Sequence, residues 1–342
     1  MAYTTINKSS AHFNTATWTG NNTARSITGV GHQPDLVWIK SRTQSYDHAL
    51  FDVVRDGHTY YIETNTNSAE ITDAQTLTSM NSDGFSLGTS NLVNQNVQNH
   101  VAWNWKANGT GAANTAGSIN STVSVNTTAG FSIVKYTGTG SAATVGHGLG
   151  VKPDMIFSKP YSTTGDWNIY HDSFSAQQRI KLNSTGAVST NSGIFSSLPT
   201  STLVNIGTSG DINANGTSHL FYCFNSVKGY SKFGKFIGNG NADGPFIYTG
   251  FKPAFVMLKN TATTSSWEIL DNKRNTFNST AKTIFPDGAG AEYDYTNKLD
   301  LLSNGFKLKT TSSPNGSGNS IIYMAFAEAP LVGSNNVPCT AR

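Results

Sequence analysis

The chain has 342 residues, and only 13% of them are charged, roughly half of the usual share of about 25% in soluble domains. The net charge is +3 with no basic cluster, which argues against a nucleic-acid-binding or membrane-binding protein. The two cysteines, Cys223 and Cys339, give no disulfide framework, and no apolar run predicts a signal peptide or a membrane span.

Residues 1–11 form a polar N-terminal segment, and residues 12–107 form the first of three repeats. The phrase WTGN (at Trp18) comes first, followed by PDLVWIK (from Pro34) and HALFD (from His48), and later by SDGFSLGT and VAWNWKA. These runs are short, aromatic and β-branched, and Gly, Asn and Ser clusters separate them. This pattern predicts strands joined by turns, and no amphipathic helix is evident.

Residues 108–129, rich in Gly, Ala, Asn and Thr, are expected to be a linker that lets the first repeat move. The second repeat, residues 130–228, contains YTGT, PDMIFSK (from Pro153), WNIYH (from Trp167), STLVNIGT and LFYCFNS. The third, residues 229–330, contains FIGN, PAFVMLK (from Pro253), WEILD (from Trp267), SNGFKLKT and IYMAFAE. Tyr230 and Phe233 at the second junction indicate that repeats 2 and 3 pack together. Residues 331–342 form a polar tail.

The spacing between the phrases identifies them as one repeated unit. In each copy the third phrase begins fourteen residues after the proline of the second. A unit of about 100 residues is large enough for one core. We therefore predict an all-β fold of three tandem antiparallel β-sandwich repeats, jelly-roll or lectin-like. The phrases that begin at the prolines should be central strands, with Trp38, Phe157 and Met257 in the core.

Two loops resemble known ligand-binding motifs. DINANG, Asp211 to Gly216, matches the start of an EF-hand calcium loop, but the closing glutamate is replaced by Tyr222, so a hairpin turn on Asn215-Gly216 is the better interpretation. GNGNADG, Gly238 to Gly244, resembles a phosphate-binding glycine loop, yet a strand-like run follows it rather than a helix. We predict a β-turn there and no metal or cofactor at either loop.

Several side chains could suggest catalysis or ligand binding. His100 and His219 share a register, but Ile321 takes their place in repeat 3, so we predict a polar strand position. Asp52 with Arg55 and Asp271 with Arg274 form a D-x-x-R phrase, which His171 and Phe174 replace in repeat 2, and we predict structural ion pairs. Glu70 and Glu292 occupy matching places but form no convincing glycosidase pair. We expect most of the six tryptophans to be core residues and one or two to lie at the surface, and we predict no catalytic residue.

A resemblance to a known family rests on longer phrases. VWIKSR, SDGFSLG, VAWNWKA, GYSKFGKFIGNGNADGPFIYTGFKPAFVMLK, LSNGFKLKTTSSPNGSGNSIIYMAFAEAP and NNVPCTAR resemble a repeat family found in virion proteins of tailed bacteriophages of aquatic bacteria. The resemblance covers nearly the whole chain and is strongest in repeat 3. It implies a tail fibre or another structural protein of the virion, made in the host cytoplasm and displayed on the particle, and it carries over no site residues.

Two functions follow from this resemblance, and neither is enzymatic. The chain is expected to be a tail fibre or receptor-binding component that contacts a host surface glycan or protein. Alternatively, it is a decoration or cement protein that grips the phage head and contacts capsid proteins. Threefold symmetry is common in both classes and would favour a homotrimer, although three repeats in one chain could supply that symmetry within a monomer.

Overall fold

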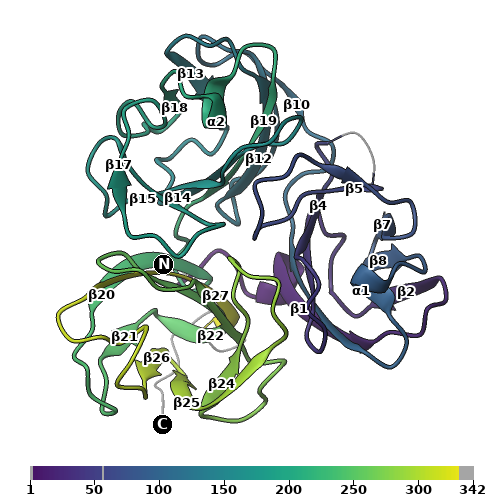
Figure 1. Ribbon diagram of the computed structural model, residues 1–342, viewed down its shortest axis with the longest axis vertical. Coiled ribbons are helices and arrows are strands. Elements are labelled where there is room, and N and C mark those ends of the chain that lie inside the picture. Colours follow the sequence, from purple (N-terminus) through teal and green to yellow (C-terminus); the bar gives the residue numbers. More distant parts are fainter. Residues whose placement is uncertain (1–2, 56–57, 331–342) are drawn as a thin grey trace.

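The computed structural model describes residues 3–55 and 58–330, which form three lobes around a common centre (Figure 1). The helical elements in this part of the chain are short: the 3-10 turn η1 (Ser9–Ala11) and the helices α1 (Asn91–Asn94) and α2 (Gly210–Asn213). All other regular elements are strands, and every pairing between the named strands is antiparallel. The prediction of an all-β fold is confirmed.

The strands follow one another through the lobes in chain order. Lobe 1 contains β1 (Phe13–Thr19), β2 (Arg25–Thr28), β3 (Leu36–Ser41), β4 (Ala49–Asp52), β5 (Tyr60–Tyr61), β6 (Ile71–Thr72), β7 (Leu77–Asn81), β8 (Gly84–Leu87) and β9 (Asn99–Trp105). Lobe 2 contains β10 (Ala112–Asn114), β11 (Ser121–Asn126), β12 (Phe131–Thr137), β13 (Ala143–Gly146), β14 (Met155–Pro160), β15 (Asn168–His171), β16 (Gln178–Lys181), β17 (Ser189–Thr190), β18 (Leu203–Ile206) and β19 (Ser218–Phe224). Lobe 3 contains β20 (Ser231–Ile237), β21 (Phe246–Tyr248), β22 (Phe251–Asn260), β23 (Glu268–Asp271), β24 (Thr280–Thr283), β25 (Tyr293–Leu302), β26 (Gly305–Leu308) and β27 (Ser320–Pro330).

Each lobe contains an inner sheet with the same strand order. The order is β1-β9-β3-β4 in lobe 1, β12-β19-β14-β15 in lobe 2 and β20-β27-β22-β23 in lobe 3. A smaller outer sheet accompanies each inner sheet, with the orders β2-β8-β7, β13-β18 and β21-β26-β25-β24. Strands at matching places in the three copies of the repeated sequence therefore hold matching places in the sheets.

The three phrases that begin at Pro34, Pro153 and Pro253 form β3, β14 and much of β22. Each of these strands has a neighbour on both sides, as predicted for central strands. All residues of β3 and β14 are buried, and in β22 Lys252 alone is exposed. The phrases read as continuous apolar runs, without alternation, because both faces of each strand are covered.

One face of each inner sheet packs on its own outer sheet, and the other faces a core shared by all three lobes. Three aromatic rings, one from each lobe, form a triangle in this common core: Trp105 at the end of β9, Phe224 at the end of β19 and Phe326 within β27. Their ring centroids are 6.4 Å (Trp105 to Phe224), 5.8 Å (Trp105 to Phe326) and 6.2 Å (Phe224 to Phe326) apart. The predicted core residues Trp38, Phe157 and Met257 also belong to the common core.

The segment 108–129 is not a linker. It contains β10 and β11, and β11 pairs with β12 from Ser121↔Tyr136 to Asn126↔Phe131, which extends the inner sheet of lobe 2. The alternation of Val123 and Val125 with small polar residues is a strand pattern within a sequence of low complexity. Because this segment is folded and lobe 1 shares the common core, the expectation that repeat 1 moves separately is wrong.

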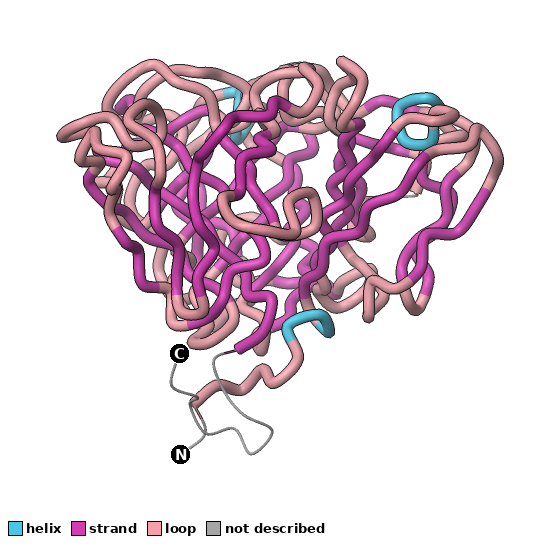
Figure 2. Tube along the Cα trace, turned by 90° about the horizontal axis from the view of Figure 1, so that it is seen from below, coloured by secondary structure: helices cyan, strands magenta, loops and turns pink. Residues whose placement is uncertain are grey.

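The two ends of the described chain lie close together. Tyr3 donates its hydroxyl to the carbonyl oxygen of Gly250 at 2.9 Å, and Pro330 pairs with Phe251. Figure 2 shows these ends on one side of the molecule and the two short helices among loops on the opposite side, which we call the loop end. Across residues 3–55 and 58–330, no helix has the length and apolar character needed to span a membrane.

Candidate functional site

The D-x-x-R residues form buried ion pairs, as predicted. Arg55 Nε lies 2.7 Å from Asp52 Oδ2, and Arg274 Nε lies 2.6 Å from Asp271 Oδ2. Each arginine also donates to a backbone carbonyl oxygen, that of Leu50 for Arg55 and that of Ile269 for Arg274. The charged groups thus have the partners that buried charges require.

Each of these aspartates also accepts a hydrogen bond from a neighbouring lobe. Tyr222 of lobe 2 donates its hydroxyl to Asp52 of lobe 1 at 2.7 Å, and Trp103 of lobe 1 donates its ring N–H to Asp271 of lobe 3 at 3.1 Å. Burial and the nearby Asp52 carboxylate raise the pKa of Tyr222, so the phenol keeps the proton that it donates. The ion pairs therefore join lobes as well as strands.

At the third junction, between lobes 2 and 3, different residues replace the aspartate, the arginine and the hydrogen-bond donor. His171 and Phe174 replace the acid and the arginine, and Met324 takes the place in β27 that Trp103 and Tyr222 take in β9 and β19. A methionine has no hydrogen to donate, so an aspartate opposite it would lack its partner. Donor, acceptor and arginine are thus replaced together, which explains why repeat 2 lacks the D-x-x-R phrase.

The two glutamates considered as a glycosidase pair lie at different junctions. Glu70 contacts Arg55 at 3.3 Å, and its backbone N–H bonds to Tyr161 of lobe 2. Glu292 contacts Arg274 at 2.9 Å and also forms a two-point ion pair with Arg42 of lobe 1. Glu70 therefore joins lobes 1 and 2 through its backbone, Glu292 joins lobes 3 and 1 through its carboxylate, and the two residues belong to different junctions.

The lysine that ends each repeated phrase is fully buried, which the sequence interpretation missed. Burial lowers the pKa of Lys40, Lys159 and Lys259 to about 8. Each Nζ donates to two backbone carbonyl oxygens: Ser41 and Gln44 for Lys40, Gly165 and Asn67 for Lys159, and Ser265 and Thr185 for Lys259. The recurrence of this lysine in all three phrases was the sequence signal from which its burial could have been predicted.

His100 and His219 are buried strand residues. Each ring stacks on an aromatic ring of its own lobe, Trp18 at 5.5 Å and Tyr136 at 5.3 Å between centroids. Burial lowers both pKa values to about 4, so both imidazoles are neutral at neutral pH. They occupy the core positions that Ile321 occupies in lobe 3.

The DINANG loop is organised by Asn213, whose side chain is fully buried at the loop end. Its Oδ1 accepts from the N–H of Thr139 at 2.8 Å, and its Nδ2 donates to the carbonyl oxygens of Ser141 and Gly207 at 2.6 and 2.9 Å. Asn94 and Asn315 make matching bonds in lobes 1 and 3. We call these three residues the asparagine clamps.

Neither candidate ligand loop has the geometry of its motif. The side chain of Asn213 bonds to neighbouring loops, and Asp211 accepts a hydrogen bond from the N–H of Asp166. The side chains at the EF-hand ligand positions therefore do not point toward a common ion site. In the part of the chain that the structure describes, no three His, Cys, Asp or Glu residues gather as a metal site would require. The GNGNADG loop joins β20 to β21, so no helix follows it.

All six tryptophans are buried, including the one or two expected at the surface. Trp167 and Trp267, which stand where His48 stands in lobe 1, donate their ring N–H groups to carbonyl oxygens of the preceding lobe, those of Glu63 and Lys181. Cys223 is buried in β19, whereas Cys339 lies outside the described residues. The tryptophans therefore position the lobes and provide no exposed platform.

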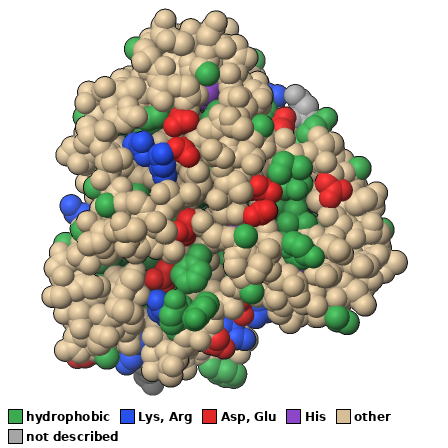
Figure 3. Space-filling view, in the orientation of Figure 1, with side chains coloured by type: hydrophobic (Ala, Val, Ile, Leu, Met, Phe, Trp, Pro, Cys, Tyr) green, Lys and Arg blue, Asp and Glu red, His purple; other side chains and the backbone are tan. Residues whose placement is uncertain are grey.

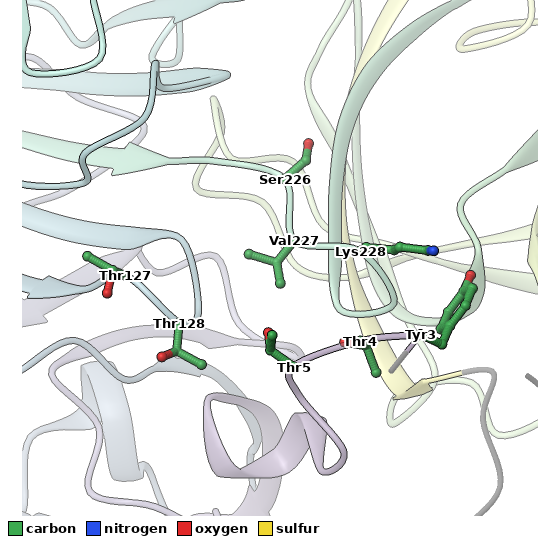
Figure 4. A pocket seen from close by; sticks show the side chains of 8 residues that line it. All are labelled: Tyr3, Thr4, Thr5, Thr127, Thr128, Ser226, Val227 and Lys228. Carbon is green, nitrogen blue, oxygen red and sulfur yellow. The ribbon is translucent and has the colours of Figure 1, made fainter. Parts of the chain in front are cut away.

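A shallow depression of about 600 Å³ lies where the lobes meet, at the side of the chain ends. Its lining comes from the segments that lead into the three inner sheets: Tyr3, Thr4, Thr5, Thr127, Thr128, Ser226, Val227 and Lys228. Figure 4 shows Thr127 and Thr128 on one side and Tyr3 and Lys228 on the other. Lys228 Nζ lies 4.4 Å from the Tyr3 ring centroid. The depression offers hydroxyl groups and one ammonium group, although more of its exposed lining is apolar than polar.

Comparison with known proteins places the chain in a family without assigning it an activity. No curated protein and no solved structure matches it. A model of a domain of unknown function, DUF7483, matches residues 8–330 as a single unit that includes all three lobes. The chain therefore belongs to the DUF7483 family.

Proposed function

We propose that the protein is a non-enzymatic component of a bacteriophage virion surface, a tail fibre or receptor-binding protein that attaches the particle to its host. The phrases that resemble tail fibre proteins support this proposal. The repeated acids and bases support it further, because Asp52, Arg55, Asp271 and Arg274 are all engaged in contacts that hold lobes together. These charged side chains therefore stabilise the arrangement of the lobes.

The observation that carries the proposal is the placement of the chain ends. Tyr3 and Pro330 lie at one side of the molecule, and the loops that include α1 and α2 lie at the other (Figure 2). A chain anchored near these ends would present its loop end outward. The asparagine clamps hold the loops there in fixed positions, which lowers the entropy lost when a ligand binds.

We further propose that each lobe is one β-sandwich, so that the chain is a tandem array of three such repeats over residues 12–107, 130–228 and 229–330, with β10 and β11 from the segment 108–129 added to the second. Each lobe pairs an inner with an outer sheet around its own apolar cluster, which supports this division. A jelly-roll or lectin-like strand connection remains part of the proposal. An experimental structure of the chain would test this strand connection.

A decoration or cement protein of the phage head is the second candidate. The observation that favours it is the threefold arrangement of the lobes (Figure 1), since one chain of this shape fits a threefold site of a capsid lattice. The same arrangement supplies threefold symmetry without a homotrimer. A solution mass near 36.5 kDa would support a monomer, and three times that mass would support a homotrimer.

Copy number per particle tests the proposed function. Quantitative mass spectrometry of purified virions should find tens of copies or fewer if the chain belongs to the tail. Hundreds of copies would favour decoration of the head. A chain absent from purified virions would contradict both candidates.

A further inference from the structure

Exposed aromatic side chains are confined to lobe 3 in the described residues. Phe246, Tyr248, Phe277 and Tyr293 are 45%, 53%, 84% and 59% exposed. Tyr293 differs from the others because it lies at the loop end, beside the junction with lobe 1: the N–H of Glu292 bonds to the carbonyl oxygen of Arg42, just beyond β3. Figure 3 shows hydrophobic side chains gathered on lobe 3 at this end of the molecule and a second group on lobe 1.

Three aromatic rings and one cation form a row at this place. Tyr293 lies 5.0 Å from Tyr295 and 6.5 Å from Phe285 between ring centroids. Lys298 Nζ lies 4.0 Å from the Tyr295 ring centroid, and it is held there by Glu268 at 2.9 Å. Because Lys298 is buried and fixed, it orders the Tyr295 ring from one side. We call Phe285, Tyr293 and Tyr295 the aromatic row.

The other lobes lack this row at matching positions. Matching positions are identified by a backbone hydrogen bond to the neighbouring lobe. The N–H of Glu292, just before Tyr293, bonds to a carbonyl oxygen of lobe 1, and the N–H groups of Glu70 and Val188 make the equivalent bonds to Tyr161 and Thr261. The residues that follow these donors are Ile71 in lobe 1 and Ser189 in lobe 2, and two residues further on stand Asp73 and Asn191. The scaffold thus recurs three times, whereas tyrosines at these two places occur once. The fold does not require the row.

Charge around the row is balanced. Lys298 is paired with Glu268, and Arg42 is paired with Glu292, so neither cation is available to an anionic ligand. Asp294 lies between the two tyrosines in β25, so its side chain points to the other face of the strand, together with that of Lys282, its partner on β24. The row therefore offers ring faces and phenol hydroxyl groups beside cations that are already paired, which suits a neutral ligand with many hydroxyl groups.

We propose that the aromatic row binds a neutral saccharide, whose C–H faces pack on the rings of Tyr293 and Tyr295 while its hydroxyl groups bond to the phenol hydroxyl groups of the same two residues. Three rings of about 150–250 Å² each, of which part is buried, present much less surface than the roughly 800 Å² per partner of a stable protein interface. This inference rests on the proposed attachment function and names the class of host ligand.

Binding of the full-length chain to an array of purified bacterial surface polysaccharides and neutral and acidic oligosaccharides tests the inference. Tyr293→Ala should weaken binding to the neutral glycans by at least tenfold, because the most exposed ring of the aromatic row is lost. Tyr293→Phe keeps the ring and should bind within a few-fold of the wild type. Phe277→Ala is the matched control, since it removes an exposed aromatic ring of the same lobe outside the row, and it should bind like the wild type.

Several results would overturn the inference: no glycan of the array binds the wild-type chain, Tyr293→Ala binds as well as the wild type, or the bound glycans are acidic only. Parallel binding to host cells separates the two proposals. A chain that adheres to cells without binding glycans through Tyr293 refutes the inference and leaves attachment standing. A chain that binds glycans through Tyr293 but is absent from virions supports the inference and refutes the proposed function.

Discussion

Replacing Phe224 by alanine should weaken all three lobes, although Phe224 belongs to lobe 2. The side chain is 2% exposed, and its ring centroid lies within 6.4 Å of five others, which come from all three lobes: Trp105, Phe131, Phe157, Phe233 and Phe326. Buried Phe→Ala changes cost about 3–5 kcal/mol. A loss of about 4 kcal/mol corresponds to a nearly thousandfold change in the folding equilibrium.

Phe221→Ala provides the matched control. Phe221 lies on the same strand and is 0% exposed, but it belongs to the core of lobe 2 alone, where it contacts Tyr136 at 4.8 Å between centroids. The two variants thus remove the same group from opposite faces of β19, at a similar expected cost. The two variants should differ in which strands lose stability.

Hydrogen exchange measured by mass spectrometry distinguishes the variants. Phe224→Ala should accelerate exchange of the protected amides in β9, β19 and β27, up to about a thousandfold. Phe221→Ala should act mainly in the strands of lobe 2. If Phe224→Ala acts in lobe 2 alone, the common core does not couple the lobes and the reasoning is refuted.

Three further predictions concern a junction, the loop end and pH. Tyr222→Phe removes the hydroxyl bonded to the buried Asp52 carboxylate and should lower the free energy of unfolding by about 1.5–3 kcal/mol in urea denaturation; an unchanged midpoint would contradict the importance of this bond. Asn213→Ala removes three hydrogen bonds and should cost about 2–3 kcal/mol, with faster exchange in the loops beside α2; a uniform increase throughout lobe 2 would argue against a local clamp. Burial lowers the pKa of Lys40, Lys159 and Lys259 to about 8, so between about pH 8 and about pH 9, where unfolded lysines and unfolded tyrosines both keep their protons, the folded chain binds fewer protons than the unfolded chain and stability should rise with pH. Single Lys→Met variants at these positions should reduce the slope, and a flat or falling wild-type profile in this window would refute the prediction.

The strand content and the threefold equivalence of the phrases could be predicted because both depend on local sequence. Short apolar runs between turn residues specify strands, and the constant spacing of the phrases specifies equivalent places in each sheet. The ion pair of Asp52 with Arg55 was also local, since the two residues are three positions apart. These features need no knowledge of how the lobes are arranged.

The junction contacts could not be predicted, because their partners are far apart in the sequence. Tyr222 and Asp52 are separated by 170 residues, and the phrases that contain them do not indicate that the two side chains meet. The replacement of the aspartate by His171 and of the hydrogen-bond donor by Met324 can be understood only once β15 and β27 are known to lie at the same junction. The buried Lys40 was missed for a different reason: its carbonyl partners lie at the end of β3 and in the loop that follows, and a lysine at a strand end is ordinarily exposed.

The strand β11 was missed because composition outweighed pattern. Ser121 to Asn126 lies in a stretch rich in small polar residues that is typical of linkers, and two valines give only a weak alternation. The strand forms because β12 offers a free edge to it along six residues. Tertiary context therefore decided a segment whose own preference was weak.

Cryo-electron microscopy of the intact phage particle that carries this chain tests the proposed role most directly. We predict density for the three lobes on the tail, with the side of Tyr3 and Pro330 toward the particle and the loop end, including the aromatic row, directed outward. An ordered lattice of the chain over the capsid, or a chain whose loop end is buried against the particle, would contradict attachment to the host.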